Sequence, residues 1–95
     1  MLDPTVRLHE LYERSRKLLH SGDLPAKRQF ADIQLEIDRL RIRHPHITER
    51  LESLYHQAHP GDAVTAGRLI AFAHERNLLL TGDPYPKKMH RIRLP

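Results

Sequence analysis

A chain of 95 residues fits one domain, which at this size buries only about 60 to 65% of the surface that its unfolded form exposes. Aromatic residues make up only 5% of the sequence and tryptophan is absent, so a small aliphatic core is expected, which favours helices over a β-sandwich. The absence of cysteine excludes disulfides, thiolate nucleophiles and cysteine-based zinc sites, and a net charge of +4 favours anionic partners only weakly.

The N-terminal stretch MLDPTVRLHELYERS has charged side chains where a signal peptide needs an uninterrupted apolar run. No stretch approaches the roughly 18 consecutive apolar residues that a membrane span requires. With the lack of cysteine, which suits a reducing compartment, this predicts a cytoplasmic protein without a membrane partner.

The first predicted helix covers residues 4–20. Asp3 followed by Pro4 is a typical helix start, because aspartate caps free amides and the first helical position needs no amide hydrogen bond. One face then collects Leu8, Leu11, Tyr12, Ser15, Leu18 and Leu19. Gly22 suits a left-handed helix end, and the new start at Asp23 follows so closely that an antiparallel second helix is expected.

Beyond this link, apolar positions alternate three and four residues apart, which is the spacing of a heptad seam. The seam consists of Phe30, Ile33, Ile37, Leu40, His44, Ile47, Leu51, Leu54 and Ala58. Its phase passes through RLRIRHPHIT without interruption, so a strand there is rejected. Pro45 lacks an amide hydrogen and disfavours helical geometry at His44, so we expect a kink or a break between helices at 24–43 and 45–58.

Apolar residues on these helices have two interpretations. Leu35 and Ile42 lie opposite the main seam, which suggests that the second helix contacts two neighbours. The seam itself is the internal core of a helical hairpin, or a surface for self-association or for a partner's helix. The residues assigned to such a partner or oligomer seam are Leu35, Ile42, Ile47, Leu51 and Leu54.

A fourth helix is predicted within AVTAGRLIAFAHERN, residues 63–77, with Asp62 as its cap. LIAFAHERNLL resembles the first helix and turn of a helix-turn-helix motif, with Asn77 at the left-handed turn and Leu78 entering the core. The DPYP stretch at residues 83–86 occupies the place of a recognition helix, so only half of the motif is present, over about a dozen residues. We expect a bundle domain at 1–82 and an irregular basic tail at 83–95, with little β structure.

Catalytic and metal-binding chemistry finds little support. Glu52, His56 and His59 follow one another at about one helical turn, but no fourth ligand is apparent, so solvated histidines are the preferred interpretation. The serines lack the glycine-flanked turn of a hydrolase, and no phosphate loop is present. We therefore expect no enzyme activity, no catalytic or metal-binding residues, no cofactor and no small-molecule substrate.

Basic side chains gather in two places that suit phosphate contacts. The tail carries Lys87, Lys88, Arg91 and Arg93 without an acidic residue, and the second helix carries Arg39, Arg41 and Arg43. Arg39 and Arg43 share a helical face, whereas Arg41 points elsewhere. A solvated tail and helix face explain the same residues equally well.

The sequence thus predicts an all-α fold, a small bundle of three or four helices with a helical hairpin core. The expected function is that of a non-enzymatic interaction module, a small cytoplasmic adaptor or regulator that binds a protein partner or a second copy of itself. The alternative is a nucleic-acid-binding protein that contacts phosphates through the tail and the arginines at 39, 41 and 43.

Overall fold

The computed structural model describes residues 3–19 and 21–86 and confirms an all-α bundle. Its elements follow in the order α1 (Pro4–Leu18), α2 (Leu24–Arg43), the 3₁₀ turn η1 (Pro45–Ile47), α3 (Glu49–Ala58) and α4 (Ala66–Arg76). Within the described residues the only β feature is an isolated antiparallel bridge between Leu78 and Pro84.

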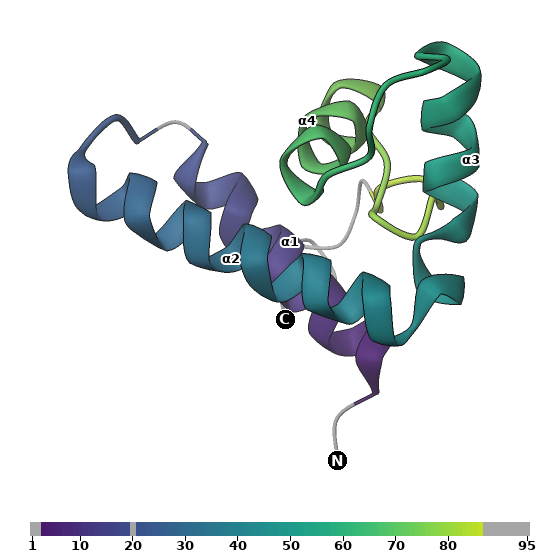
Figure 1. Cartoon of the computed structure of the whole chain (residues 1–95). Helices are drawn as coiled ribbons and strands as arrows, with labels where there is room; N and C mark the ends of the chain where they lie inside the picture. The colour runs from purple at the N-terminus through teal and green to yellow at the C-terminus, as the bar shows by residue number, and fades with distance from the viewer. Residues whose placement is uncertain (1–2, 20, 87–95) are drawn as a thin grey trace.

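The first two helices begin where an aspartate close to a proline predicts a start. The Asp3 carboxylate accepts a hydrogen bond of 2.8 Å from the Thr5 amide, and Asp23 caps α2 in the same way through Ala26 at 3.1 Å. The two helices lie side by side as a hairpin (Figure 1). α1 ends at Leu18, two residues before the predicted boundary.

The chain breaks at Pro45 rather than kinking. His44 leaves helical geometry, with φ −133° and ψ 68°, while its amide still donates to the Leu40 carbonyl at 2.8 Å. Pro45–Ile47 then form a single 3₁₀ turn, so α3 begins at Glu49 instead of at 45. This break lets α3 turn away from the axis of α2 and stand beside α4 (Figure 1).

The start of α4 differs from the prediction. Thr65, not Asp62, is its cap: the Thr65 hydroxyl accepts a hydrogen bond from the Arg68 amide at 3.2 Å. Asp62 instead closes a turn by donating its amide to the His59 carbonyl, so α4 starts three residues later than expected. At the other end Asn77 adopts the left-handed conformation, with φ 58° and ψ 48°, that the sequence suggested.

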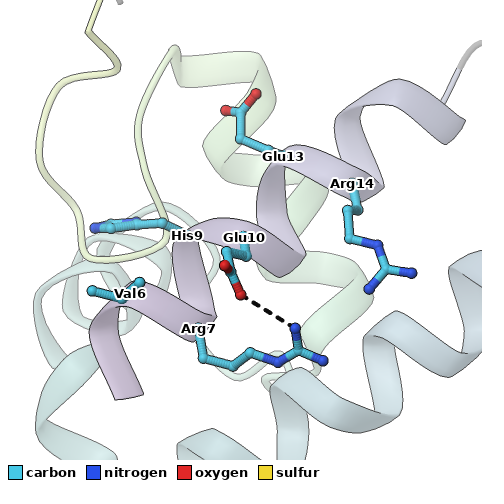
Figure 2. Close-up of a pocket in the computed structure, with 6 residues that line it drawn as sticks. All are labelled: Val6, Arg7, His9, Glu10, Glu13 and Arg14. Carbon is cyan, nitrogen blue, oxygen red and sulfur yellow. Dashed lines mark hydrogen bonds and ion pairs between the residues drawn. The ribbon is translucent and has the colours of Figure 1, made fainter. Parts of the chain in front are cut away.

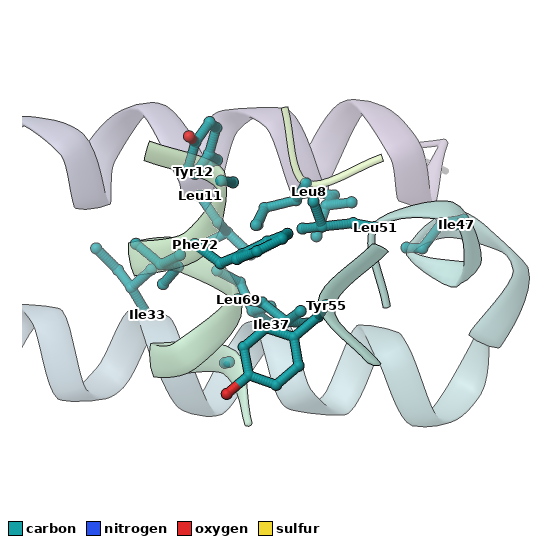
Figure 3. Close-up of a cluster of buried hydrophobic side chains, with 14 residues drawn as sticks. Leu8, Leu11, Tyr12, Ile33, Ile37, Ile47, Leu51, Tyr55, Leu69 and Phe72 are labelled. Carbon is teal, nitrogen blue, oxygen red and sulfur yellow. The ribbon is translucent and has the colours of Figure 1, made fainter. Parts of the chain in front are cut away.

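The core lies where α4 crosses the α1–α2 hairpin, with α3 closing one side (Figures 1 and 3). Every helix and the segment after α4 contribute to it. The buried cluster consists of Leu8, Leu11, Tyr12, Ile33, Ile37, Ile47, Leu51, Tyr55, Ala66, Leu69, Ile70, Phe72, Ala73 and Leu80.

The residues assigned to a partner seam divide into two groups. Ile47 and Leu51 are buried in the core, and the partly buried Leu54 packs against it, so these three side chains serve the interior of the chain. Leu35 and Ile42 remain 55% and 78% exposed. α2 does contact both α1 and α4, but the side chains that it buries lie on its opposite face, not at these two positions.

Residues 78–86 form a compact, non-helical segment that returns to α1. This described segment after α4 therefore contains no recognition helix. The Tyr12 hydroxyl donates to the Leu78 carbonyl at 2.7 Å, and the Tyr85 hydroxyl donates to Glu13. Burial, together with the Glu13 carboxylate, raises the pKa of Tyr85 and keeps this donor protonated. Residues 83–86 therefore pack on the bundle, whereas the basic residues from 87 onward lie outside the described part.

We expect Gly82→Ala to lower the free energy of unfolding by about 1–3 kcal/mol. Gly82 has φ +93°, and a Cβ atom there would lie 2.9 Å from Cγ of Arg50 and 3.0 Å from the Leu51 amide nitrogen. Gly22→Ala is the matched control, because its Cβ would meet nothing within 4 Å. Urea unfolding followed by circular dichroism measures both; equal effects would contradict the steric explanation.

Candidate functional site

The solvent side of α2 carries a line of exposed aliphatic side chains. Leu24, Leu35 and Ile42 are 60%, 55% and 78% exposed, which makes them the most exposed large aliphatic side chains in the described chain. They are separated by 11 and 7 residues, close to whole numbers of helical turns, so they align along about 27 Å of the helix. The exposed Ala31 lies on the same line.

Two charged residues fill the gaps in this line, Arg28 between Leu24 and Ala31, and Asp38 between Leu35 and Ile42. We define the outer face of α2 as these six residues: Leu24, Arg28, Ala31, Leu35, Asp38 and Ile42. It points away from the core, because the buried residues of α2 lie on the opposite side. A soluble helix normally has one apolar side, so a second one needs a partner or is left in water.

A hollow adjoins one end of the outer face. It lies between the end of α2 and α3. Ile42 and the ring of Pro45 form its apolar part, and the rest of its wall is polar: Arg41, Glu49, Glu52, Ser53 and His56. The hollow exists because the break at His44 separates the two helices instead of letting them run on as one. An apolar side chain entering it would contact Ile42 and the proline ring.

Arg41 is a structural residue, not a free cation. Its guanidinium donates to Asp38 and, from Nε, to Glu52 at 3.1 Å, and Thr48 donates its hydroxyl to the same Glu52 oxygen at 2.7 Å. The Arg41 side chain is only 15% exposed. These contacts tie α2 to α3 across the break, so Arg41 has little capacity left for a phosphate.

Arg39 and Arg43 are placed differently. Both are exposed, and they line a hollow with Arg7, Glu36 and Leu40 between α1 and α2. Arg7 donates to Glu36 at 2.8 Å, a hydrogen bond that raises the pKa of Arg7. No ion pair of Arg39 or Arg43 is formed within the described residues, so both stay available to an anion.

The histidines of α3 make contacts that differ from those of a metal site. Glu52 is already engaged by Arg41 and Thr48, and the His59 ring lies against the Tyr55 ring at a tilt of 37°, with 4.9 Å between the ring centroids. Across residues 3–19 and 21–86, no three His, Cys, Asp or Glu side chains are grouped so that they could hold a metal ion. His59 therefore acts as a packing residue at the end of α3.

A further hollow runs along α1, where six side chains line it (Figure 2). Figure 2 shows that they fan out from the helix instead of converging on one point, and that Arg7 and Glu10 bind each other across one turn. General acid-base or nucleophilic catalysis needs groups directed at a common reacting atom. This arrangement provides no such point.

No family model, curated protein or solved structure matches this chain. Among the described helices, none has the length and apolar character that crossing a bilayer demands. The outer face of α2 and the arginine pair Arg39 and Arg43 are thus the surfaces on which a function can be argued. The sequence pointed to Leu35 and Ile42, whereas Leu24, Arg28, Ala31 and Asp38 were missed, although their regular spacing along α2 was visible.

We expect Arg41→Ala to lower the free energy of unfolding by about 1–2 kcal/mol, because it leaves Glu52 and Asp38 without their shared donor. Arg39→Ala removes a similar side chain that forms no ion pair with the described residues, and it should stay within about 0.5 kcal/mol of the parent protein. Chemical denaturation measures both changes. Equal losses would show that Arg41 does not join α2 to α3.

Proposed function

We propose that this chain is a non-enzymatic interaction module, a small adaptor or regulator of the cytoplasm, which binds a protein through the outer face of α2. The observation that carries the proposal is the alignment of three strongly exposed aliphatic side chains on a helix whose other side is already buried. Single exposed aliphatic residues are ordinary, but an aligned set is typical of helix-to-helix or helix-in-groove recognition.

The hollow beside Ile42 supports the same proposal. Binding energy in interfaces concentrates where an aliphatic or aromatic anchor enters a pocket and excludes water. The hollow provides such a pocket at one end of the outer face, and Arg41 holds its walls together through Glu52. A partner therefore meets a surface whose shape is set before binding.

The double variant Leu35→Lys/Ile42→Lys should lose its bound proteins in a pull-down from nuclease-treated lysate, because two charges would be desolvated in the interface. The measurement compares, by quantitative mass spectrometry, what parent and variant retain. Val6→Lys is the matched control, since Val6 is a 48% exposed aliphatic residue away from α2 and should change nothing. Unaltered capture by the folded double variant would refute the proposal.

Nucleic-acid binding is the second candidate. Arg39 and Arg43 stand one helical turn apart, exposed and without an ion pair in the described residues, beside the guanidinium of Arg7. Lys and Arg side chains gain affinity for phosphates by releasing condensed counterions. The sequence adds four basic residues at 87–93, which lie outside the described part.

If nucleic acid is the partner, affinity for a labelled single strand or duplex should fall steeply between about 50 and 200 mM salt. Arg39→Ala/Arg43→Ala should reduce the slope of log affinity against log salt by roughly 1.5–2, and alanine at Lys87, Lys88, Arg91 and Arg93 by more. Lys17→Ala, which removes an exposed charge of α1, is the control. A flat salt response in fluorescence anisotropy would exclude this candidate.

A further inference from the structure

The outer face of α2 has the same spacing when read in either direction. Its six positions, 24, 28, 31, 35, 38 and 42, are separated alternately by four and three residues. A rotation of 180° about an axis that is perpendicular to the helix at residue 33 superimposes these six positions on themselves in reverse order. Leu24 then lies opposite Ile42, Ala31 opposite Leu35, and Arg28 opposite Asp38.

We infer that this face binds a second copy of the chain, with the two α2 helices antiparallel about a twofold axis at the level of residue 33. The inference rests on the proposed function and names its partner. It requires that both copies use the same surface, which is the rule for twofold dimers. The four-three spacing is that of a coiled-coil seam, in which antiparallel helices place each residue against the complementary position of the other helix.

Charge selects the antiparallel orientation. In that orientation each Arg28 meets an Asp38, twice in the dimer, whereas parallel helices would set Arg28 against Arg28 and Asp38 against Asp38. Arg41 binds Oδ1 of Asp38 within the chain, and Oδ2 makes no hydrogen bond in the described structure. Arg28 is exposed and forms no ion pair with the described residues, so both groups are available.

Shape agrees with this pairing. Near the axis the small Ala31 lies against Leu35, which lets the two helices approach closely. At each end, Leu24 of the second copy projects from the first turn of its helix toward Ile42 and the adjoining hollow. Within each chain, the bonds from Arg7 to Glu36 and from Arg41 to Glu52 place α1 and α3 on either side of α2, so neither covers the outer face.

One residue beside the face opposes the dimer. Asp32 lies next to the axis on the side of α1, where the antiparallel arrangement brings the two copies of Asp32 toward each other. Because the two carboxylates repel each other, their approach weakens association. Asp32→Asn should therefore strengthen the dimer, which gives the experiment a change in the opposite direction.

Sedimentation equilibrium of the full chain from about 5 to 500 µM tests the inference. A single pair of helices buries less than the roughly 1,200–2,000 Å² of standard interfaces, so we expect a dimer dissociation constant of about 10–100 µM. Arg28→Asp and Asp38→Arg should each weaken the dimer by about tenfold or more, because both symmetry-related pairs become repulsive. Lys17→Asp makes the same change of charge on α1 and should leave the constant unaltered.

Restoring the charge match should restore the dimer. An equimolar mixture of the Arg28→Asp and Asp38→Arg chains, and the double variant that carries both changes, should each associate within about threefold of the parent. Because Asp38 also binds Arg41, circular dichroism checks that each variant is folded. A monomeric mixture of folded chains, or a Lys17→Asp chain as weak as Arg28→Asp, overturns the inference.

Cysteine substitution tests the orientation, since the chain has no cysteine of its own. Leu24→Cys and Ile42→Cys chains, oxidised together, should give a mixed disulfide in preference to either symmetric one. Preferred symmetric disulfides would indicate parallel helices and overturn the inference. A parent chain that stays monomeric up to about 500 µM overturns it as well. If the Leu35→Lys/Ile42→Lys variant nevertheless loses captured protein in the lysate experiment, the proposed function stands with another protein as the partner.

Discussion

The packing of α4 into the α1–α2 hairpin is the contact on which the other contacts depend. α1, α2 and α3 all contact α4, which places Ala66, Leu69, Ile70, Phe72 and Ala73 in the buried cluster. Small residues make the close approach feasible: Ala66 and Ala73 are fully buried, and a Cβ atom at Gly67 would lie 3.1 Å from the Gln34 side chain. With few aromatic residues in the sequence, such close packing replaces the volume that large side chains supply elsewhere.

The helices were predictable where a local signal determines the backbone. Asp3 and Asp23, each close to a proline, specify the first two starts, and Pro45 specifies the interruption. The start of α4 was not predictable in this way, since Asp62 and Thr65 are both good caps. The structure uses Thr65, whose hydroxyl accepts from the Arg68 amide, while the Asp62 amide closes a turn with the His59 carbonyl.

The candidate site was only partly visible in the sequence, because a heptad seam has the same spacing whether its partner belongs to the same chain or to another. Ile47 and Leu51 turned out to face the interior, whereas Leu35 and Ile42 face solvent. The availability of Arg41 for a phosphate was also only partly predictable from the sequence. Asp38, three residues earlier on α2, was a visible partner for Arg41, but Glu52 comes from another helix, so the pattern within α2 shows only one of the two carboxylates that neutralise it.

The break at His44 also limits how many ways α2 can be paired. A regular four-three pattern on a long helix allows a neighbour to slide by one heptad and find nearly the same contacts, which leads to mixed registers and open-ended chains of molecules. Here the outer face stops at Ile42, one residue before α2 ends at Arg43. A neighbour shifted by seven residues leaves one end of the line unmatched. By ending α2, Pro45 limits the length of the outer face and thereby favours a closed pair of chains over a fibre.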